Sequence, residues 1–116
     1  LAPTILELAG LRPLETWKDK PVPPAPGKSL VRAFAADVSI ERDALWWSHD
    51  GHRALRAKDW KLVSAKGAPW ELFDLAADPA ETRNLATEQP EKVAVMEKRW
   101  LAMQEDFRLS ATGKAP

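Results

Sequence analysis

Apolar and polar positions alternate over short stretches in the middle of the chain and recur at helical spacing near its end. Between residues 44 and 75, four short apolar or alternating runs are separated by turn-forming residues. Consecutive runs of this kind predict an antiparallel meander. The expected fold is therefore α+β: a four-stranded antiparallel sheet packed against a long C-terminal helix. The runs are Ala44–Ser48, Arg53–Arg56, Trp60–Ser64 and Trp70–Leu75.

Two hairpin signals separate these runs. Asp50-Gly51 lies between the first two, and this dipeptide is favoured in two-residue hairpin turns because both central residues need positive φ. Residues 65–69 contain Gly67 and Pro69 and predict a second hairpin loop.

A long helix is predicted to begin near Pro90. Glu91 lies in its first turn, where a negative charge is favoured. Apolar side chains recur at steps of three or four residues, which indicates one buried face that we expect to cover the sheet. From Ser110 onward we expect a frayed polar tail. The apolar positions are Val93, Met96, Trp100, Met103 and Phe107.

The first third of the chain has a different pattern. Pro3 to Gly10 predicts a short helix that starts at proline and ends at a left-handed glycine. Residues 13–26 hold five of the ten prolines and no apolar periodicity, which predicts an extended connector. Residues 27–42 are ambiguous between a helical turn and a buried loop.

Composition narrows the classes of function. Among 116 residues, 17 basic and 17 acidic side chains cancel, which argues against a nucleic-acid or anionic membrane partner. There is no cysteine, hence no disulfide or thiolate chemistry, and no apolar run of membrane-spanning length. Because the chain begins at Leu1 rather than methionine, we expect it to be a fragment.

His49 and His52 bracket the predicted Asp50-Gly51 turn and are the main candidates for chemistry. Opposed positions of such a hairpin place their Cβ atoms about 4.5–5.5 Å apart on one face. Two imidazoles at that distance could share a metal, shuttle a proton or bind an anion. The alternative is that they are two solvated turn histidines, since loops lie mostly at the surface.

An acidic pair and a set of three lysines are further candidate sites, and both are better explained as structural or solvent-exposed residues. Asp78 and Glu81 could serve acid–base chemistry or bind calcium, but a local role in a turn is favoured, with Asn84 bonding neighbouring amides. Three lysines resemble an anion site in sequence, but acidic neighbours separate them and we expect them to lie in solvent. These are Lys58, Lys61 and Lys66.

Three motifs in order resemble the sulfatase family. Residues 47–63 are similar to the C-terminal sulfatase pattern W-x-H-x-G-x-R-A-x-R-x-G-D-W-K-L-V. Residues 70–85 resemble W-E-L-Y-D-L-x-x-D-P-x-E-x-x-N-L, and residues 3–10 resemble P-T-L-L-D-L-A-G. Lys58 stands where many members have glycine, which raises the question of how tight that turn is. His52 stands where many have asparagine, which leaves the substrate preference open.

The resemblance implies an alkaline-phosphatase-like α/β hydrolase that cleaves sulfate esters. Its nucleophile is a formylglycine made from Cys or Ser in a C/S-x-P-x-R motif, and a bound calcium polarises the sulfate. That motif is absent here, so no catalytic residue and no metal ligand is assigned to this chain. The formylglycine and the calcium are expected in a missing N-terminal catalytic domain. The resemblance carries over only a loop at the rim of the substrate pocket, with His49, Asp50 and His52 as substrate-binding residues.

The implied organisation has two parts. Residues 1–43 form a short helix and proline-rich arm at the edge of the missing catalytic domain, and residues 44–116 form the sheet-and-helix subdomain. The expected partners are that domain and a sulfated small molecule or glycan, with self-association of the fragment as a further expectation. The family habit is periplasmic or secreted. The alternatives are a related phosphonate monoester hydrolase or phosphodiesterase, and a non-catalytic binding module that uses exposed tryptophans.

Overall fold

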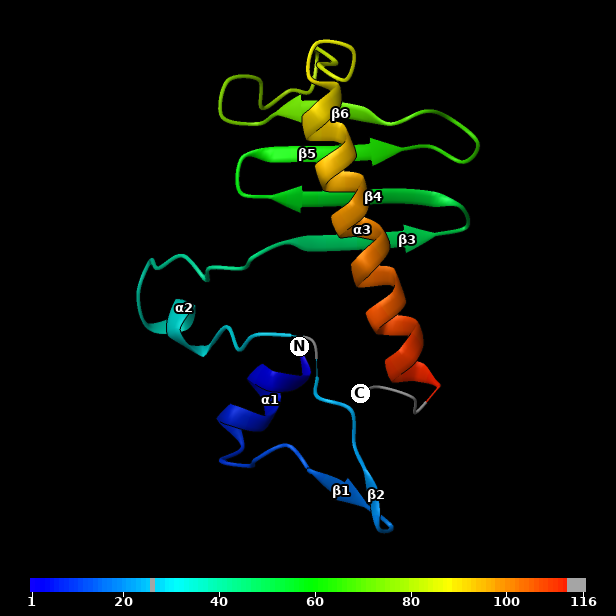
Figure 1. The fold of residues 1–116 in the computed structure, drawn as a ribbon. Coiled ribbons are helices and arrows are strands. Elements are labelled where there is room, and N and C mark those ends of the chain that lie inside the picture. Colours follow the sequence, from blue (N-terminus) through cyan, green and yellow to red (C-terminus); the bar gives the residue numbers. More distant parts are fainter. Residues whose placement is uncertain (26, 113–116) are drawn as a thin grey trace. The chain divides into compact units, whose positions relative to one another are not determined.

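A computed structural model describes residues 1–25 and 27–112. The chain divides into two compact units, one formed by residues 1–41 with Thr112 and the other by residues 42–111. The assignment of the first unit to the edge of a catalytic domain stays a prediction. Each unit has its own secondary structure (Figure 1).

Residues 42–111 contain the predicted meander. Its four strands are antiparallel and hydrogen-bonded in chain order, β3-β4-β5-β6 (Figure 1). The sheet and the long helix of the expected fold are thereby confirmed. The strands are β3 (Leu45–His49), β4 (His52–Ala57), β5 (Trp60–Ser64) and β6 (Glu71–Asp74).

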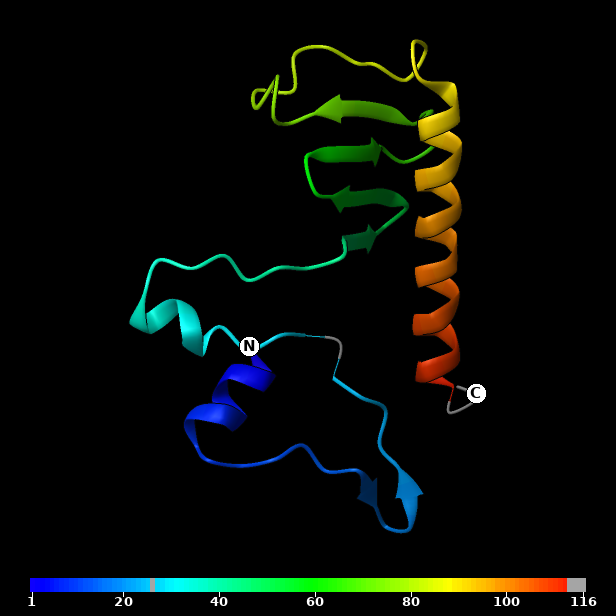
Figure 2. The same ribbon diagram turned by 60° about the vertical axis from the view of Figure 1, so that its left-hand side comes forward.

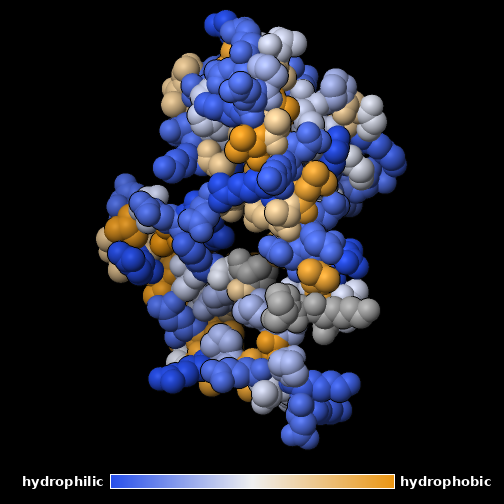
Figure 3. Space-filling view, in the orientation of Figure 1, coloured by the Kyte–Doolittle hydropathy of each residue, from blue (hydrophilic) through white to orange (hydrophobic). Residues whose placement is uncertain are grey.

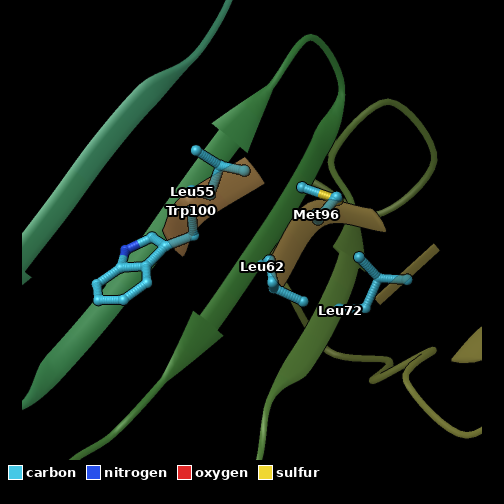
Figure 4. Close-up of a cluster of buried hydrophobic side chains, with 5 residues drawn as sticks. All are labelled: Leu55, Leu62, Leu72, Met96 and Trp100. Carbon is cyan, nitrogen blue, oxygen red and sulfur yellow. The ribbon is translucent and has the colours of Figure 1, made fainter. Parts of the chain in front are cut away.

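Helix α3 (Pro90–Ala111) lies across one face of this sheet (Figures 1 and 2). Side chains alternate between the two faces of a strand, so cross-strand partners share a face. The central row of the covered face comes from one residue of each strand, and the helix adds Met96 and Trp100 over it (Figure 4). This row is Trp46, Leu55, Leu62 and Leu72, of which the three leucines are fully buried.

The end of α3 differs slightly from the expectation. The helix continues through Ser110 to Ala111, so the polar tail does not begin at Ser110. The remainder of that predicted tail, residues 113–116, lies outside the described residues. Val93 and Met103 pack against the core at its margin, and Phe107 contacts Trp46 with ring centroids 5.1 Å apart.

The hairpin turns follow local backbone chemistry. Asp50 and Gly51 both have positive φ, +46° and +83°, as the two-residue turn requires. Lys58 takes a φ of +53° between β4 and β5, and Ala57 pairs directly with Trp60. The turn therefore stays at two residues although lysine stands where many sulfatases have glycine, and the lysine backbone adopts the left-handed conformation.

The outer edge of β6 is closed by the segment that follows it. Asn84 Oδ1 accepts hydrogen bonds from the backbone N–H of Leu72 at 3.1 Å and of Ala86 at 2.9 Å. The N–H of Leu85 donates to the carbonyl oxygen of Leu72 at 2.8 Å. The predicted structural role of Asn84 is confirmed, because its amide replaces a strand partner at this edge.

Residues 1–41 form the smaller unit. Helix α1 (Ala2–Leu8) is followed by Gly10 at a φ of +66°, and α2 (Val31–Ala35) resolves the ambiguous stretch as a helical turn. The extended connector predicted for residues 13–26 is wrong in part, because β1 (Thr16–Trp17) and β2 (Lys20–Pro21) pair as a small hairpin. The structure does not describe residue 26.

A hydrogen bond joins α1 to the start of α2 in this smaller unit. Thr4 is buried, and its hydroxyl accepts the backbone N–H of Leu30 at 3.0 Å. A helix of seven residues is too short to be stable alone, so contact with the α2 region supports α1.

The two units differ in how their apolar side chains are exposed. In the view of Figure 3, hydrophobic surface over residues 42–111 is limited to spots between hydrophilic side chains. The smaller unit exposes several large apolar side chains, including Ile5, Leu8 and Trp17. Within the described residues, no helix has the length and apolar character needed to cross a bilayer.

Candidate functional site

The turn between β3 and β4 brings the two histidines together as predicted. His49 and His52 are direct cross-strand partners on either side of Asp50-Gly51. Strand alternation places them on the sheet face opposite α3, because Trp46 and Leu55, each three residues away, face the helix. Both histidines are exposed, so their imidazoles are available to a ligand or a partner.

Arg53, next to His52, anchors this end of β4 on the helix side. Its guanidinium lies over the ring of Trp70, 4.2 Å from the centroid, and donates to the Ser64 hydroxyl at 3.0 Å. Ser64 is buried and its own hydroxyl donates to the carbonyl oxygen of Ala68 at 2.8 Å. Because Arg53 is held on one face, the period of two directs His52 to the other.

The loop between β5 and β6 contacts the histidine turn. Lys66 Nζ donates to Asp50 Oδ1 at 3.0 Å, and both side chains are largely exposed. A Cβ on Gly51 would lie 2.9 Å from Cγ of Lys66, so the lysine stem packs against the glycine. Gly51 is thus required both by its positive φ and by this close approach. Lys66 is in solvent as expected, but it also forms an ion pair with Asp50.

The chemistry open to this turn is hydrogen bonding and charge pairing. Neutral imidazole offers one donor and one acceptor, and protonated imidazole offers two donors. A shared metal lacks support, because the described residues contain no group of three His, Cys, Asp or Glu side chains that could hold one. Proton transfer, binding of an anion or another polar group of a ligand, and solvation alone stay open for His49 and His52.

Hollows lined by described residues occur elsewhere on the surface, and two of them are well defined. One, of about 570 Å³, lies at the start of α3 and is lined by residues 88–92 and Val95. The other, of about 450 Å³, belongs to the smaller unit and is lined by residues 28, 29, 32 and 39–41. Neither hollow includes His49 or His52, so neither supports the predicted substrate contacts.

Of the acidic pair Asp78 and Glu81, only Asp78 has the local turn role that was predicted. Asp78 Oδ2 accepts the N–H groups of Thr82 at 2.7 Å and Arg83 at 2.8 Å. The hydrogen bond from the Arg83 backbone is the largest effect that lowers the pKa of Asp78 below its ordinary value. This carboxylate organises a turn, and the structure does not place it with the histidines.

Lys61 and Glu81 form a pair that sequence reasoning missed. Lys61 Nζ lies 2.7 Å from both carboxylate oxygens of Glu81, and both side chains are about two-thirds buried. The expectation that Lys61 lies free in solvent is therefore wrong. Lys61 and Glu81 are 20 residues apart in the chain, so their pairing follows from tertiary packing that a local sequence pattern does not predict. Glu81 also takes a positive φ of +56°, which is uncommon for glutamate.

Relatives of known class match almost the whole chain. An uncharacterized sulfatase of Schizosaccharomyces pombe is 31% identical over 111 residues, which is 90% of this chain. Arylsulfatase K of Xenopus laevis is 30% identical over 122 aligned residues, or 97% of this chain. The chain therefore resembles sulfatases over almost its whole length. No protein-family model matches it.

The chain spans only about a fifth of the relatives' length, 20% of the Schizosaccharomyces pombe protein and 23% of the Xenopus laevis protein. A solved structure also matches it: BT4656 in complex with its substrate D-glucosamine-2-N,6-O-disulfate. The TM-score is 0.62 at 23% identity, over 92% of this chain and 23% of that one. The likeness shows the fold, an antiparallel sheet packed against a C-terminal helix.

Proposed function

We propose that this chain is the C-terminal portion of a sulfatase that hydrolyses sulfate esters. In the complete enzyme it completes the fold and the substrate pocket and contributes no catalytic residue. The observation that carries the proposal is the asymmetry of the matches: sulfatases cover 90–97% of this chain, but the chain covers 20–23% of them. The missing four-fifths of the relatives' length would hold the catalytic domain, which is this chain's partner.

The formylglycine and the calcium that the family resemblance implies do not fit the residues present here. No cysteine occurs, no serine is followed two places later by proline, and the described residues form no metal-binding group. Sulfate-ester cleavage would therefore be performed by residues outside this chain.

The role proposed for this chain in catalysis is substrate selection. His49, Asp50 and His52 would line the pocket rim and contact the part of the substrate beyond its sulfate. Support comes from the exposure of both imidazoles and from their pairing across the turn. The substrate class we propose is a sulfated small molecule or glycan, because the matched solved structure holds a sulfated sugar, D-glucosamine-2-N,6-O-disulfate.

Enzyme assays test the proposal. The complete polypeptide should hydrolyse nitrophenyl sulfate and should lose this activity on treatment with EDTA. The purified 116-residue chain should show no turnover. Turnover by the short chain alone would contradict the proposal, as would a complete polypeptide that cleaves phosphonate esters and no sulfate ester.

A further inference from the structure

The sheet of residues 42–111 carries a helix on one face only. Within this fully described segment, α3 is the single helix and it packs against the face that carries Leu55, Leu62 and Leu72. Figure 2 shows α3 along one side of the four strands. The opposite face must therefore either meet solvent or pack against something else.

Register identifies the side chains on that opposite face. One cross-strand row consists of Trp47, Ala54, Val63 and Glu71, and His49 with His52 extends the same face toward the turn. The next row contains Leu45, Arg56, Lys61 and Phe73. We call the surface formed by Trp47, Ala54, Val63, His49 and His52 the open face.

The open face has an apolar centre and a polar margin. Trp47 is 48% exposed, and Ala54 and Val63 beside it are only half-buried. Toward β6 the chain covers itself, since Phe73 is only 7% exposed and Lys61 is paired with Glu81. An indole with apolar neighbours and a polar rim has the composition of an interface centre.

We infer that the open face is the surface through which this chain docks on the catalytic part of the sulfatase. Two observations select that occupant. The matched segment is only 20–23% of each relative, so most of each relative lies outside the counterpart of this chain. The open face also carries His49 and His52, so a catalytic domain packed against Trp47 would bring the proposed pocket rim to its own surface.

The inference rests on the proposed function but is more specific. It requires that Trp47, Ala54 and Val63 be covered in the complete enzyme, while the outer surface of α3 remains in solvent. Leu101 offers a matched comparison, because it is 49% exposed, it is also a large apolar residue, and it lies on α3.

The experiment is site-directed photo-crosslinking in the complete polypeptide. For cross-linking, p-benzoylphenylalanine is incorporated during translation at position 47, 54 or 101. Separate Trp47→Cys and Ala54→Cys variants supply thiols for maleimide labelling. The second variant is nearly isosteric and guards against misfolding of the first. Leu101→Cys is the control. After irradiation, mass spectrometry identifies the cross-linked peptides, and the rate of maleimide labelling reports exposure.

The expected result is a cross-link from position 47 or 54 to peptides outside residues 1–116. Labelling at these positions should be at least tenfold slower than at position 101, with equal rates in denaturant. The control should give no cross-link to those peptides. The inference is overturned by cross-links to residues 1–41, by cross-links to the same face of a second copy that vanish on dilution, or by labelling as fast as at position 101.

The results distinguish failure of the docking surface from failure of the proposed activity. If the cross-links appear but the complete polypeptide has no sulfatase activity, the docking surface stands and the proposed activity fails. If activity is present but positions 47 and 54 stay exposed, the proposed activity stands and the docking surface fails.

Discussion

Trp46 and Trp100 join the sheet to the helix through both ring packing and a hydrogen bond. Their rings stack with centroids 5.5 Å apart, and the indole N–H of Trp46 donates to the carbonyl oxygen of Trp100 at 3.2 Å. Trp100 in turn donates its indole N–H to the carbonyl oxygen of Trp47 at 3.0 Å. The ring packing and the two hydrogen bonds fix the position of α3 along β3, the edge strand that ends at the histidine turn.

Replacement of Trp100 by alanine should strongly destabilise this subdomain. Trp100 is 3% exposed and packs with Met96 and the three buried leucines, so truncation leaves a large cavity. The expected loss is about 3–5 kcal/mol of unfolding free energy, measured by urea denaturation. Leu101→Ala is the matched control on the exposed side and should cost much less. A loss below about 1 kcal/mol for Trp100→Ala would contradict the assignment of the buried helix face.

Asn84 should stabilise the edge of β6 through its side-chain oxygen alone. Asn84→Ala leaves the N–H of the buried residue Leu72 without its acceptor, which should cost about 1–3 kcal/mol in a urea melt. Asn84→Asp keeps an oxygen at the same place and should retain most of the stability at neutral pH. Equal losses for the two variants would show that the amide oxygen is not the stabilising group.

The fold was largely predictable because its signals are local. Asp50-Gly51 specifies a hairpin turn, and the spacing from Val93 to Phe107 specifies one helix face. The hairpin of the smaller unit escaped prediction because Lys18 and Asp19 both take positive φ in its turn without glycine. Neither lysine nor aspartate by itself predicts the left-handed backbone conformation, which costs energy for residues with a Cβ.

The candidate site was predictable only in its turn. Register alone brings His49 opposite His52, and this follows from the length of the turn. The support from Lys66 and the anchoring of Arg53 on Trp70 depend on contacts between segments 16 and 17 residues apart in the chain. Such pairs follow from tertiary packing, and no pattern within a single strand encodes them.

Stability should depend on pH through Asp78. Its pKa is lowered in the folded state by the N–H donors of Arg83 and Thr82, so folding favours the ionised form. The unfolded state binds the proton more readily, with an ordinary pKa of about 3.9. The contribution of Asp78 is therefore complete at neutral pH and is lost as the pH falls from about 4 through the lowered pKa. Asp78→Asn should reduce this acid sensitivity in urea melts at pH 3 and pH 7.

The control is Asp106→Asn on the exposed surface of α3. It should leave the difference in unfolding free energy between pH 3 and pH 7 unchanged. Equal behaviour of both variants would contradict the role of Asp78.

The histidine turn should matter for substrates larger than the sulfate ester itself. In the complete enzyme, His49→Ala should leave stability nearly unchanged, because His49 is exposed. It should lower kcat/KM on the natural substrate about tenfold or more, equivalent to roughly 1.4 kcal/mol of transition-state binding. Nitrophenyl sulfate lacks the distant groups and should be affected less. Glu71, which is exposed and lies in β6 beside Val63, provides the control: Glu71→Ala should change neither rate. Unchanged kinetics of His49→Ala on both substrates would reduce His49 to a solvated turn residue, whereas equal losses on both would place it at the reacting sulfate rather than at the rim.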